Sequence, residues 1–207
     1  MGSMGGEVRD SRKVIAVFDF DGTITNRDSF FLFLWYSQGL MSLLLKSILS
    51  IPTLTLYATK AMPNYQAKER IFSIFFGNLE MEKFERCCES FRSILNSVIK
   101  PNAIQKIKWH QEMGHEVVIL SASAENWIIP WAKGNGIYIV LATQLQVKDS
   151  RLTGKFKSRN CYGAEKVARL LNHFPGRQNY ELYAYGDSRG DKELLEIADH
   201  SFYRKFM

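Results

Sequence analysis

Acidic residues stand directly after apolar segments of this sequence, where they could act together. Asp19 and Asp21 lie one residue apart at the end of the apolar run Lys13–Phe20 (KVIAVFDF). Two carboxylates so close repel each other, and burying them unpaired is costly. A cation would make such a pair tolerable. The candidate site residues are Asp19, Asp21, Gly22, Thr23, Ser121, Ala122, Lys166, Asp187 and Asp191.

This set of residue types suits the transfer of a phosphoryl group. Several carboxylate oxygens can hold Mg²⁺ together with its remaining waters. One carboxylate can then attack phosphorus, while another protonates the leaving oxygen and later deprotonates water. Backbone N–H groups at Gly22 and Thr23 can bind phosphate oxygens, Lys166 adds positive charge, and Ser121 adds a hydroxyl donor. Positioning and charge neutralisation are most of what this chemistry requires.

Alternating strand and helix patterns must bring these residues together. Strands are expected at Lys13–Phe20, His115–Leu120, within residues 136–147 and at Glu181–Tyr185, with a short strand near the C-terminus and a hairpin over residues 145–157 that turns at Gly154. Helices are expected at Pro101–Met113, Ala164–Phe174 and Lys192–Ala198. This order predicts an α/β fold with a Rossmann-like parallel sheet core. Ligands bind such sheets at the carboxyl ends of the strands, where the candidate residues lie.

A helical insert interrupts the α/β pattern after the first strand. Helices are expected over Asn64–Phe76 and Glu80–Leu95, separated by the stop-and-cap pair Gly77-Asn78. The sheet domain then comprises residues 7–26 and 99–207, and residues 27–98 form the insert. Residues 1–6 (MGSMGG) are typical of an expression scar and are set aside.

Four motifs resemble, in order and spacing, those of the haloacid dehalogenase superfamily of phosphohydrolases. They are DFDGT (19–23), SAS (121–123), YGAEKVARL (162–170) and GDSRGD (186–191). The resemblance implies a Mg²⁺-dependent phosphatase that forms an aspartyl-phosphate intermediate, and an insert that is a C1-type cap. Asp21 argues against the dehalogenase branch, whose members usually lack this second acid.

The same resemblance implies a role for each matching residue. Asp19 would be the nucleophile and a metal ligand, and Asp21 the general acid/base with its backbone carbonyl on the metal. Asp187 would be a direct metal ligand, and Asp191 would support the metal site. The phosphoryl group would be bound by Gly22, Thr23, Ser121, Ala122 and Lys166.

The position of the insert is similar to subfamily IB of this superfamily, which contains the phosphoserine phosphatases. Relatives that hydrolyse phosphoserine tend to have Glu where this chain has Asp28, nine residues after Asp19, and Ser where it has Gly22. Asp28 is therefore a candidate for substrate selection. The apolar start of the insert also resembles the bacterial phosphatidylglycerophosphate phosphatases. We expect a lipid phosphate or another small phosphomonoester as substrate, with phosphoserine as the alternative.

Residues 30–58 are unusually apolar for a cap helix. Lys46 lies within this segment and Pro52 interrupts it, so it is a poor membrane span. Three interpretations remain open: a buried cap core, a membrane-facing hairpin, and a groove for a partner. Membrane contact through residues 30–58 would place the protein at the inner face of the membrane, and otherwise we expect it in the cytoplasm.

The composition limits the other classes of function. The net charge is +6, but the basic residues are scattered, so nucleic acid is not expected as a partner. Three cysteines without a CxxC pair indicate a reduced, intracellular protein. The oligomeric state is not predicted. A phosphotransferase and a non-catalytic binding protein on the same fold are the alternatives to a hydrolase.

Overall fold

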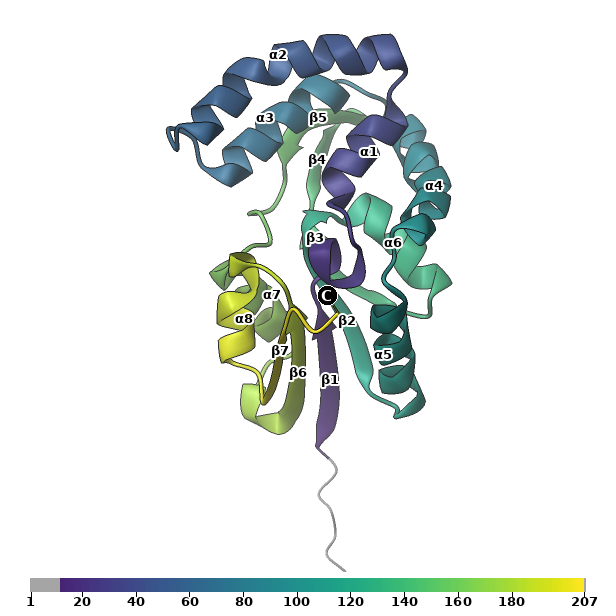
Figure 1. The fold of residues 1–207 in the computed structure, drawn as a ribbon, viewed down its shortest axis with the longest axis vertical. Helices are drawn as coiled ribbons and strands as arrows, with labels where there is room; N and C mark the ends of the chain where they lie inside the picture. The colour runs from purple at the N-terminus through teal and green to yellow at the C-terminus, as the bar shows by residue number, and fades with distance from the viewer. Residues whose placement is uncertain (1–11, 207) are drawn as a thin grey trace, which may run out of the picture.

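A five-stranded parallel sheet forms the centre of the molecule in this computed structural model (Figure 1). The structure describes residues 12–206, so the suggested expression scar at residues 1–6 lies outside them. The strands run in the order β3-β2-β1-β6-β7. They are β1 (Lys13–Phe18), β2 (Glu116–Ala124), β3 (Ile139–Thr143), β6 (Tyr180–Gly186) and β7 (His200–Tyr203).

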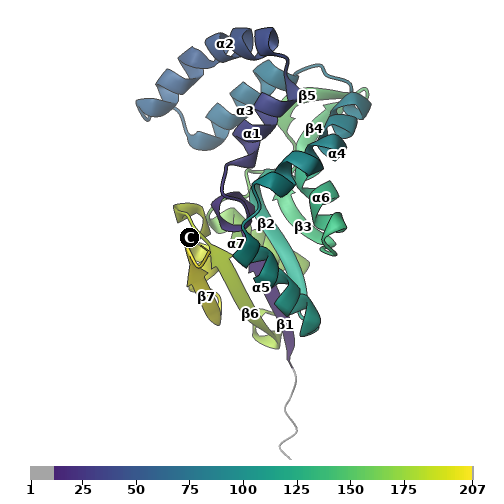
Figure 2. The same cartoon turned by 45° about the vertical axis from the view of Figure 1, so that its right-hand side comes forward.

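Helices cover both faces of this sheet because its strands are apolar on both sides (Figure 2). Ile15 and Val17 of β1 pack on the side of α7 (Ala164–His173) and α8 (Lys192–Glu196). The alternate residues Ala16 and Phe18 join the other buried cluster, with α5 (Pro101–Glu112) and α6 (Glu125–Gly134). The expectation of an α/β Rossmann-like core is confirmed.

β1 and β2 do not end where the corresponding apolar runs of the sequence end. β1 ends at Phe18, because the chain turns over Phe20–Ile24, where Gly22 has a φ of +84°. β2 continues through Ser121–Ala124 along β3, so the predicted end at Leu120 was too early. The consequence is that the SAS motif lies within the strand and faces the end of β1.

The predicted hairpin is present as β4 (Leu145–Lys148) and β5 (Arg151–Phe156), but its turn was misplaced. The chain turns at Asp149-Ser150, whose φ angles are +49° and +58°. Gly154 lies inside β5 instead, with a φ of +82°. A Cβ atom there would lie 2.5 Å from the Ser73 Oγ and 2.8 Å from its Cα, so glycine lets β5 approach the insert.

Four helices of the insert lie beyond the carboxyl ends of the strands (Figure 1). They are α1 (Ser29–Ser37), α2 (Leu40–Ala58), α3 (Asn64–Phe76) and α4 (Met81–Ser97). An aromatic cluster joins three of them, since the Phe33 ring of α1 contacts Phe76 and Phe91 at centroid distances of 5.4 and 5.0 Å. Phe33 also stacks on Trp127 of α6 at 4.8 Å, which anchors the insert to the sheet domain.

The apolar segment 30–58 does not form one buried core. Phe30, Phe33 and Leu34 of α1 are buried, in agreement with that interpretation. In α2, however, the apolar side chains point outward, and Leu45 and Leu49 are 59% and 64% exposed. The buried-core interpretation is therefore wrong for α2. By length and composition α2 could cross a membrane, and only 11% of it is buried.

We predict that Gly154→Ala destabilises the protein more than Gly114→Ala does. Both glycines have a positive φ, so each substitution introduces strain of about 1–2 kcal/mol. Only the new Cβ at residue 154 also collides, with Ser73, and overpacking adds roughly 1–3 kcal/mol. Urea unfolding measures the two free energies. Equal losses in the two variants would show that the close contact of β5 and α3 carries no energy.

Candidate active site

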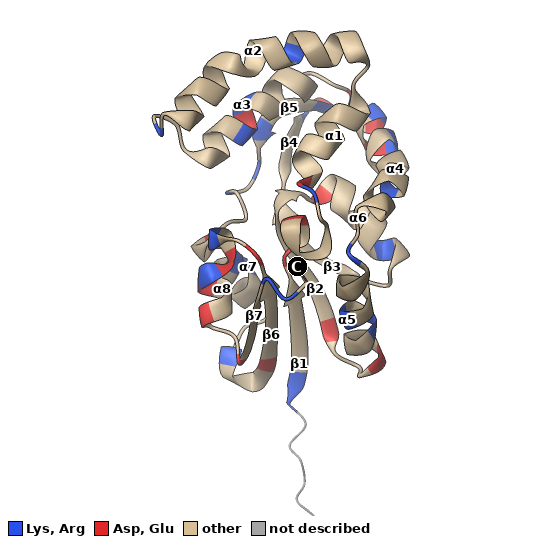
Figure 3. Ribbon diagram, in the orientation of Figure 1, with Lys and Arg blue, Asp and Glu red and all other residues tan. Residues whose placement is uncertain are grey.

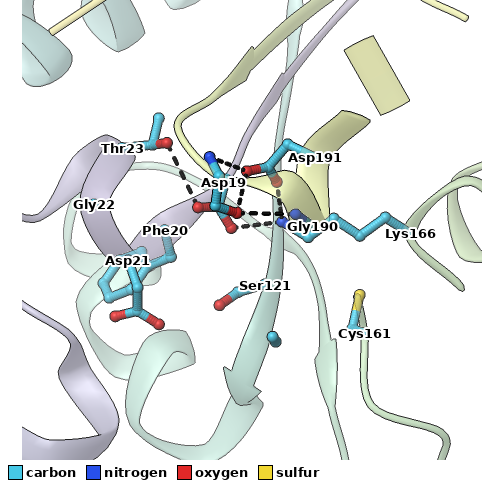
Figure 4. A network of polar contacts seen from close by, with 12 residues as sticks. Asp19, Phe20, Asp21, Gly22, Thr23, Ser121, Cys161, Lys166, Gly190 and Asp191 are labelled. Atoms are coloured by element: carbon cyan, nitrogen blue, oxygen red, sulfur yellow. Dashed lines mark hydrogen bonds and ion pairs between the residues drawn. The ribbon is translucent and has the colours of Figure 1, made fainter. Parts of the chain in front are cut away.

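The candidate residues meet where β1, β2 and β6 end (Figure 4). Asp19 directly follows β1, and its backbone N–H donates to the carbonyl of Tyr185 in β6 at 2.9 Å. Asp187 directly follows β6. Because the three strands are parallel and adjacent, their ends lie at one edge of the sheet. Residues distant in sequence therefore share one site.

Lys166 of α7 joins two buried carboxylates in this site. Its Nζ lies 2.5 Å from Asp19 Oδ1 and 2.6 Å from Asp191 Oδ1, and the side chain is only 2% exposed. Burial alone would lower the pKa of Lys166, but the charges of Asp19 and Asp191 raise it above its usual range. Burial raises the pKa of Asp19 to about 7, against the opposing charge of Lys166.

Asp191 also fixes the loop that carries Asp187. Its Oδ2 accepts from the backbone N–H groups of Asp187 (3.2 Å) and Ser188 (3.0 Å) and from the Ser188 hydroxyl (2.9 Å). Asp191 is fully buried, so these bonds are shielded from water. The carboxylate of Asp187 is thereby held at the sheet edge beside Asp19.

Asp21 has a different set of partners. The backbone N–H of Ser29 donates to its Oδ1 at 2.7 Å, and the Ser123 hydroxyl donates to its Oδ2 at 2.5 Å. No bond to Lys166 involves this carboxyl among the described residues. Burial raises the pKa of Asp21, and the charge of Asp28 raises it further. Asp21 is therefore oriented by neutral donors, whereas Asp19 is paired with a cation.

The acidic cluster fits a hard divalent cation. One oxygen from each of Asp19, Asp187 and Asp191 lies within 4.8 Å of the others. Burial, together with the charge of Asp191, raises the pKa of Asp187, so the cluster repels itself without a cation. Gly22 leaves room for this arrangement, because a Cβ there would lie 2.2 Å from Asp187 Oδ2. The all-oxygen donor set is the kind that Mg²⁺ prefers.

A pocket of about 350 Å³ opens above the carboxylates. Six of the predicted site residues line it: Asp19, Asp21, Asp28, Ala122, Lys166 and Asp187. The insert supplies much of the opposite wall through Phe30 and Phe31 of α1, Leu54 and Tyr57 of α2, and Asn64, Ala67, Lys68 and Ile71 of α3. The pocket is therefore acidic and cationic at its base and largely apolar on the side of the insert.

The other predicted residues lie behind the pocket wall. The Thr23 hydroxyl donates to Asp19 Oδ2 (3.5 Å) and Asp187 Oδ1 (3.4 Å), which ties these carboxylates together. The Gly22 N–H points to the Thr25 hydroxyl at 3.4 Å, and the buried Ser121 hydroxyl accepts from the Ser123 N–H at 3.1 Å. Direct phosphate binding by Gly22, Thr23 and Ser121 remains a prediction.

The structure adds three residues that the motifs did not single out. Ser29 and Ser123 orient Asp21. Ser123 is the last residue of the SAS motif, but the motif did not assign it a role. Lys68 lines the pocket from α3 and its charge acts to lower the pKa of Asp21. Lys68 shares a face of α3 with Asn64 and Ile71, so the helical spacing of these three residues in the sequence could have indicated that they act together.

We predict that Lys166→Met lowers the free energy of unfolding by about 3–5 kcal/mol at neutral pH without divalent cations, because buried carboxylates lose their cation. The pKa of Asp19, about 7 with Lys166 present, should rise further. A carboxyl whose pKa is raised by folding favours the folded state at low pH, so the loss should shrink as pH falls from 7 towards 4.

Urea unfolding at several pH values measures this loss. The matched control is Lys192→Met, since Lys192 pairs with Glu196 on the surface and its side chain is 71% exposed. We expect the control to change stability by less than about 0.5 kcal/mol. A Lys166→Met variant as stable as the control would contradict the central role of Lys166.

Comparison with known proteins identifies the family. The haloacid dehalogenase-like hydrolase model matches residues 16–196. Protein CicA of Caulobacter vibrioides is 32% identical over 213 residues, which cover 99% of this chain and 90% of CicA. A histidinol-phosphatase of Neisseria meningitidis is 26% identical, with 89% of this chain and 87% of that protein covered.

Solved structures show the same fold. A Bordetella pertussis protein of unknown function superposes with a TM-score of 0.75 at 20% identity, covering 90% of this chain and 87% of the other. The phosphoserine phosphatase of T. onnurineus superposes with a TM-score of 0.60 at 19% identity, covering 95% and 86%. The family and its phosphatase-named members support the expectation of a phosphatase enzyme. The chain belongs to the haloacid dehalogenase-like hydrolases.

Proposed function

We propose that the protein is a Mg²⁺-dependent phosphomonoester hydrolase that acts through an aspartyl-phosphate on Asp19. The observation that carries this proposal is the unequal pair of carboxylates in one pocket. Asp19 is bonded to the buried Lys166, whereas Asp21 is held by the neutral donors Ser29 and Ser123. Carboxylates with such different partners can take the roles of nucleophile and acid.

In the first step an ionised Asp19 oxygen attacks phosphorus, and the bond between phosphorus and the ester oxygen breaks. Lys166 favours the ionised form of Asp19. The leaving oxygen takes its proton from Asp21, whose raised pKa favours the protonated form that an acid needs. In the second step Asp21 accepts a proton from water, the resulting hydroxide attacks phosphorus, and phosphate leaves with both electrons of the Asp19–phosphorus bond returning to Asp19.

Asp19, Asp187 and the backbone carbonyl of Asp21 would hold Mg²⁺, and Asp191 would keep Asp187 in position through the bonds described above. The cation would neutralise charge on the carboxylates and on the phosphoryl oxygens. Lys166 would contribute a further positive charge from the pocket base. Ala122 lies at the pocket wall, where its backbone could contact the phosphoryl group.

The insert over residues 27–98 would act as a C1-type cap of subfamily IB that selects the substrate. Asp28 lines the pocket, but its Oδ1 accepts from the backbone N–H groups of Phe30 (2.9 Å) and Phe31 (3.3 Å) and so caps α1. The apolar side chains of Phe30, Phe31 and Leu54 favour a small or lipid phosphomonoester. Asp28 and Lys68 line the same pocket and supply the acid and base that phosphoserine, the alternative substrate, would need.

We predict that Asp19→Asn lowers phosphate release from a phosphomonoester at least about 10³-fold, because the amide is not a nucleophile. Asp21→Asn should lower it by about 10²–10⁴-fold through loss of the proton transfer. Phosphate release in the presence of Mg²⁺ is the measurement. Release of the alcohol without an equivalent release of phosphate would point to a phosphotransferase instead.

The control is Asp149→Asn, because Asp149 lies in the hairpin turn with a φ of +49°, a conformation that Asn also adopts. This variant should keep wild-type turnover. Wild-type turnover by Asp19→Asn would refute the mechanism, and an inactive wild type with intact Mg²⁺ binding would favour a non-catalytic binding protein.

We predict that Mg²⁺ raises the melting temperature of the wild type. At a hundredfold excess over Kd the stabilisation is about 2.7 kcal/mol, and each kcal/mol raises Tm by roughly 2–4 °C in a chain of this size. Asp187→Asn should lose most of this rise. Without Mg²⁺ the same variant should melt no lower than the wild type, because it removes a charge that burial and Asp191 disfavour.

Thermal melts with EDTA and with excess Mg²⁺ measure both effects, and Asp149→Asn again serves as the control. Comparing the two melts distinguishes a metal ligand from a structural residue, because substituting a structural residue would lower Tm both with EDTA and with excess Mg²⁺. An unchanged Mg²⁺ response in Asp187→Asn would exclude that carboxylate from the metal site.

A further inference from the structure

The outer face of α2 is a continuous apolar surface. Figure 3 shows the helix almost free of charged residues along its length. Ten apolar side chains of α2 are each at least 40% exposed: Leu40, Met41, Leu44, Leu45, Ile48, Leu49, Ile51, Leu54, Leu56 and Tyr57. Soluble proteins rarely expose so many neighbouring apolar side chains without a function for them.

The inner face of α2 carries polar residues as well as the partly buried Leu43, whereas the inner face of a surface helix is usually apolar. Lys46 donates from its Nζ to the carbonyl of Phe75 (2.8 Å) and to the Gln38 Oε1 (3.0 Å). Ser50 and Thr53, one and two turns further along, are 2% and 6% exposed. Lys46 thus bonds α2 to α3, whereas the Ser50 hydroxyl donates back to the Lys46 carbonyl within α2, and the leucines on the opposite side of the helix face outward.

The apolar surface continues into the pocket. Leu54 and Tyr57 line the pocket together with Asp19 and Lys166 and also belong to the exposed face of α2. A ligand whose phosphate meets the carboxylates therefore has an apolar path outward along α2. This combination of a charged base and an apolar rim is complementary to an amphiphile with a phosphate head.

The charge around α2 favours an anionic surface. Residues 29–68 contain Lys46, Lys60 and Lys68 but no Asp or Glu. Lys46 bonds inward to Phe75 and Lys68 lines the pocket, so Lys60 is the exposed lysine and no acidic side chain of this segment opposes it. Exposed aromatic side chains occur on the helices that precede and follow α2 in the chain, with Trp35 of α1 at 62% and Tyr65 of α3 at 47% exposure. Trp and Tyr are enriched where proteins meet the boundary between lipid and water.

We infer that α2 lies in the plane of a lipid bilayer surface and delivers to the pocket a phosphomonoester whose acyl chains remain in the lipid. The substrate part of this inference rests on the proposed function. A spanning orientation would require α2 to leave α3 and to break the bond from Lys46 to Phe75. A second copy seated on α2 would instead cover Leu54 and Tyr57 at the pocket rim.

The decisive variant is Leu45→Gln/Ile48→Gln/Leu49→Gln, which keeps the helix and changes only side chains that are 59–64% exposed and outside the pocket lining. The matched control is Met113→Gln/Tyr138→Gln, which changes exposed apolar side chains of the sheet domain. Vesicles of phosphatidylcholine and phosphatidylglycerol are the binding probe. The wild type and control should co-sediment with them, and the triple variant should bind at least about tenfold more weakly.

Hydrolysis separates the membrane surface from the chemistry. Phosphatidic acid in the same vesicles is the lipid substrate, and p-nitrophenyl phosphate is the water-soluble one. The triple variant should lose at least about tenfold in lipid hydrolysis, in line with its weaker binding. Its turnover of the soluble ester should stay within about twofold, since no pocket contact changes. Asp19→Asn should hydrolyse neither ester and still bind vesicles.

Three results would overturn the inference. The wild type does not bind the vesicles; the triple variant binds and hydrolyses the lipid as the wild type does; or sedimentation equilibrium shows a dimer that the triple variant disrupts. If the wild type binds vesicles through α2 but hydrolyses neither ester, the proposed function fails while the membrane surface is supported.

Discussion

The ion pairs of Lys166 with Asp19 and Asp191 are the interaction on which the candidate active site depends. Lys166 is 2% exposed and contacts Asp19 from the start of the chain and Asp191 from near its end. Removing Lys166 would leave the two carboxylates buried without a cation, and removing both carboxylates would leave Lys166 buried without an anion. Either change costs several kcal/mol. The sheet order is consistent with this arrangement, because β1 and β6 are adjacent and their carboxyl ends lead to Asp19 and to the turn that carries Asp191.

At this edge of the sheet the carboxylates outnumber the lysine that pairs with them, and this excess of negative charge accounts for the other features of the site. Lys166 has one positive charge, whereas Asp19, Asp187 and Asp191 converge within 4.8 Å. Burial raises the pKa of Asp19 to about 7, so full ionisation of the cluster needs more positive charge than the chain supplies. A divalent cation would meet that need, and the missing side chain at Gly22 leaves room for the Asp187 carboxylate beside it.

Much of this fold and site could be predicted from sequence, because periodicity and motif order report on buried strands and their ends. The strand carrying Asp19, the helix Asn64–Phe76 and the position of Lys166 all followed from such patterns. The hairpin turn did not, since a glycine suggested a turn but was needed for contact with Ser73. Lys68 was missed as well, because a lysine on an amphipathic helix is usually solvated.

The exposure of α2 could not be read from its composition, because an apolar segment is expected to be buried. Helix α4 of the same insert shows that the insert does offer a core: Phe84, Cys88, Phe91 and Leu95 follow helical spacing and are all buried. Within one insert, α4 therefore buries its apolar side chains, whereas α2 exposes most of its own. In α2 the buried or half-buried side chains include Lys46, Ser50 and Thr53, and Lys46 bonds to the Phe75 carbonyl of α3.

The outward-facing apolar side chains of α2 lie next to the pocket that contains the carboxylates, which bears on the substrate that the site would favour. The carboxylates and Lys166 lie at the base of the pocket, Lys68 lines it from α3, and Leu54 and Tyr57 line it from α2. A phosphomonoester that enters past Leu54 and Tyr57 would therefore pass an apolar surface first. A substrate with apolar chains can keep them there while its phosphate reaches Asp19, whereas a fully polar substrate would gain nothing from that contact. The inward position of Lys46 therefore leaves an apolar surface beside the acidic pocket, and the proposed choice of substrate depends on both.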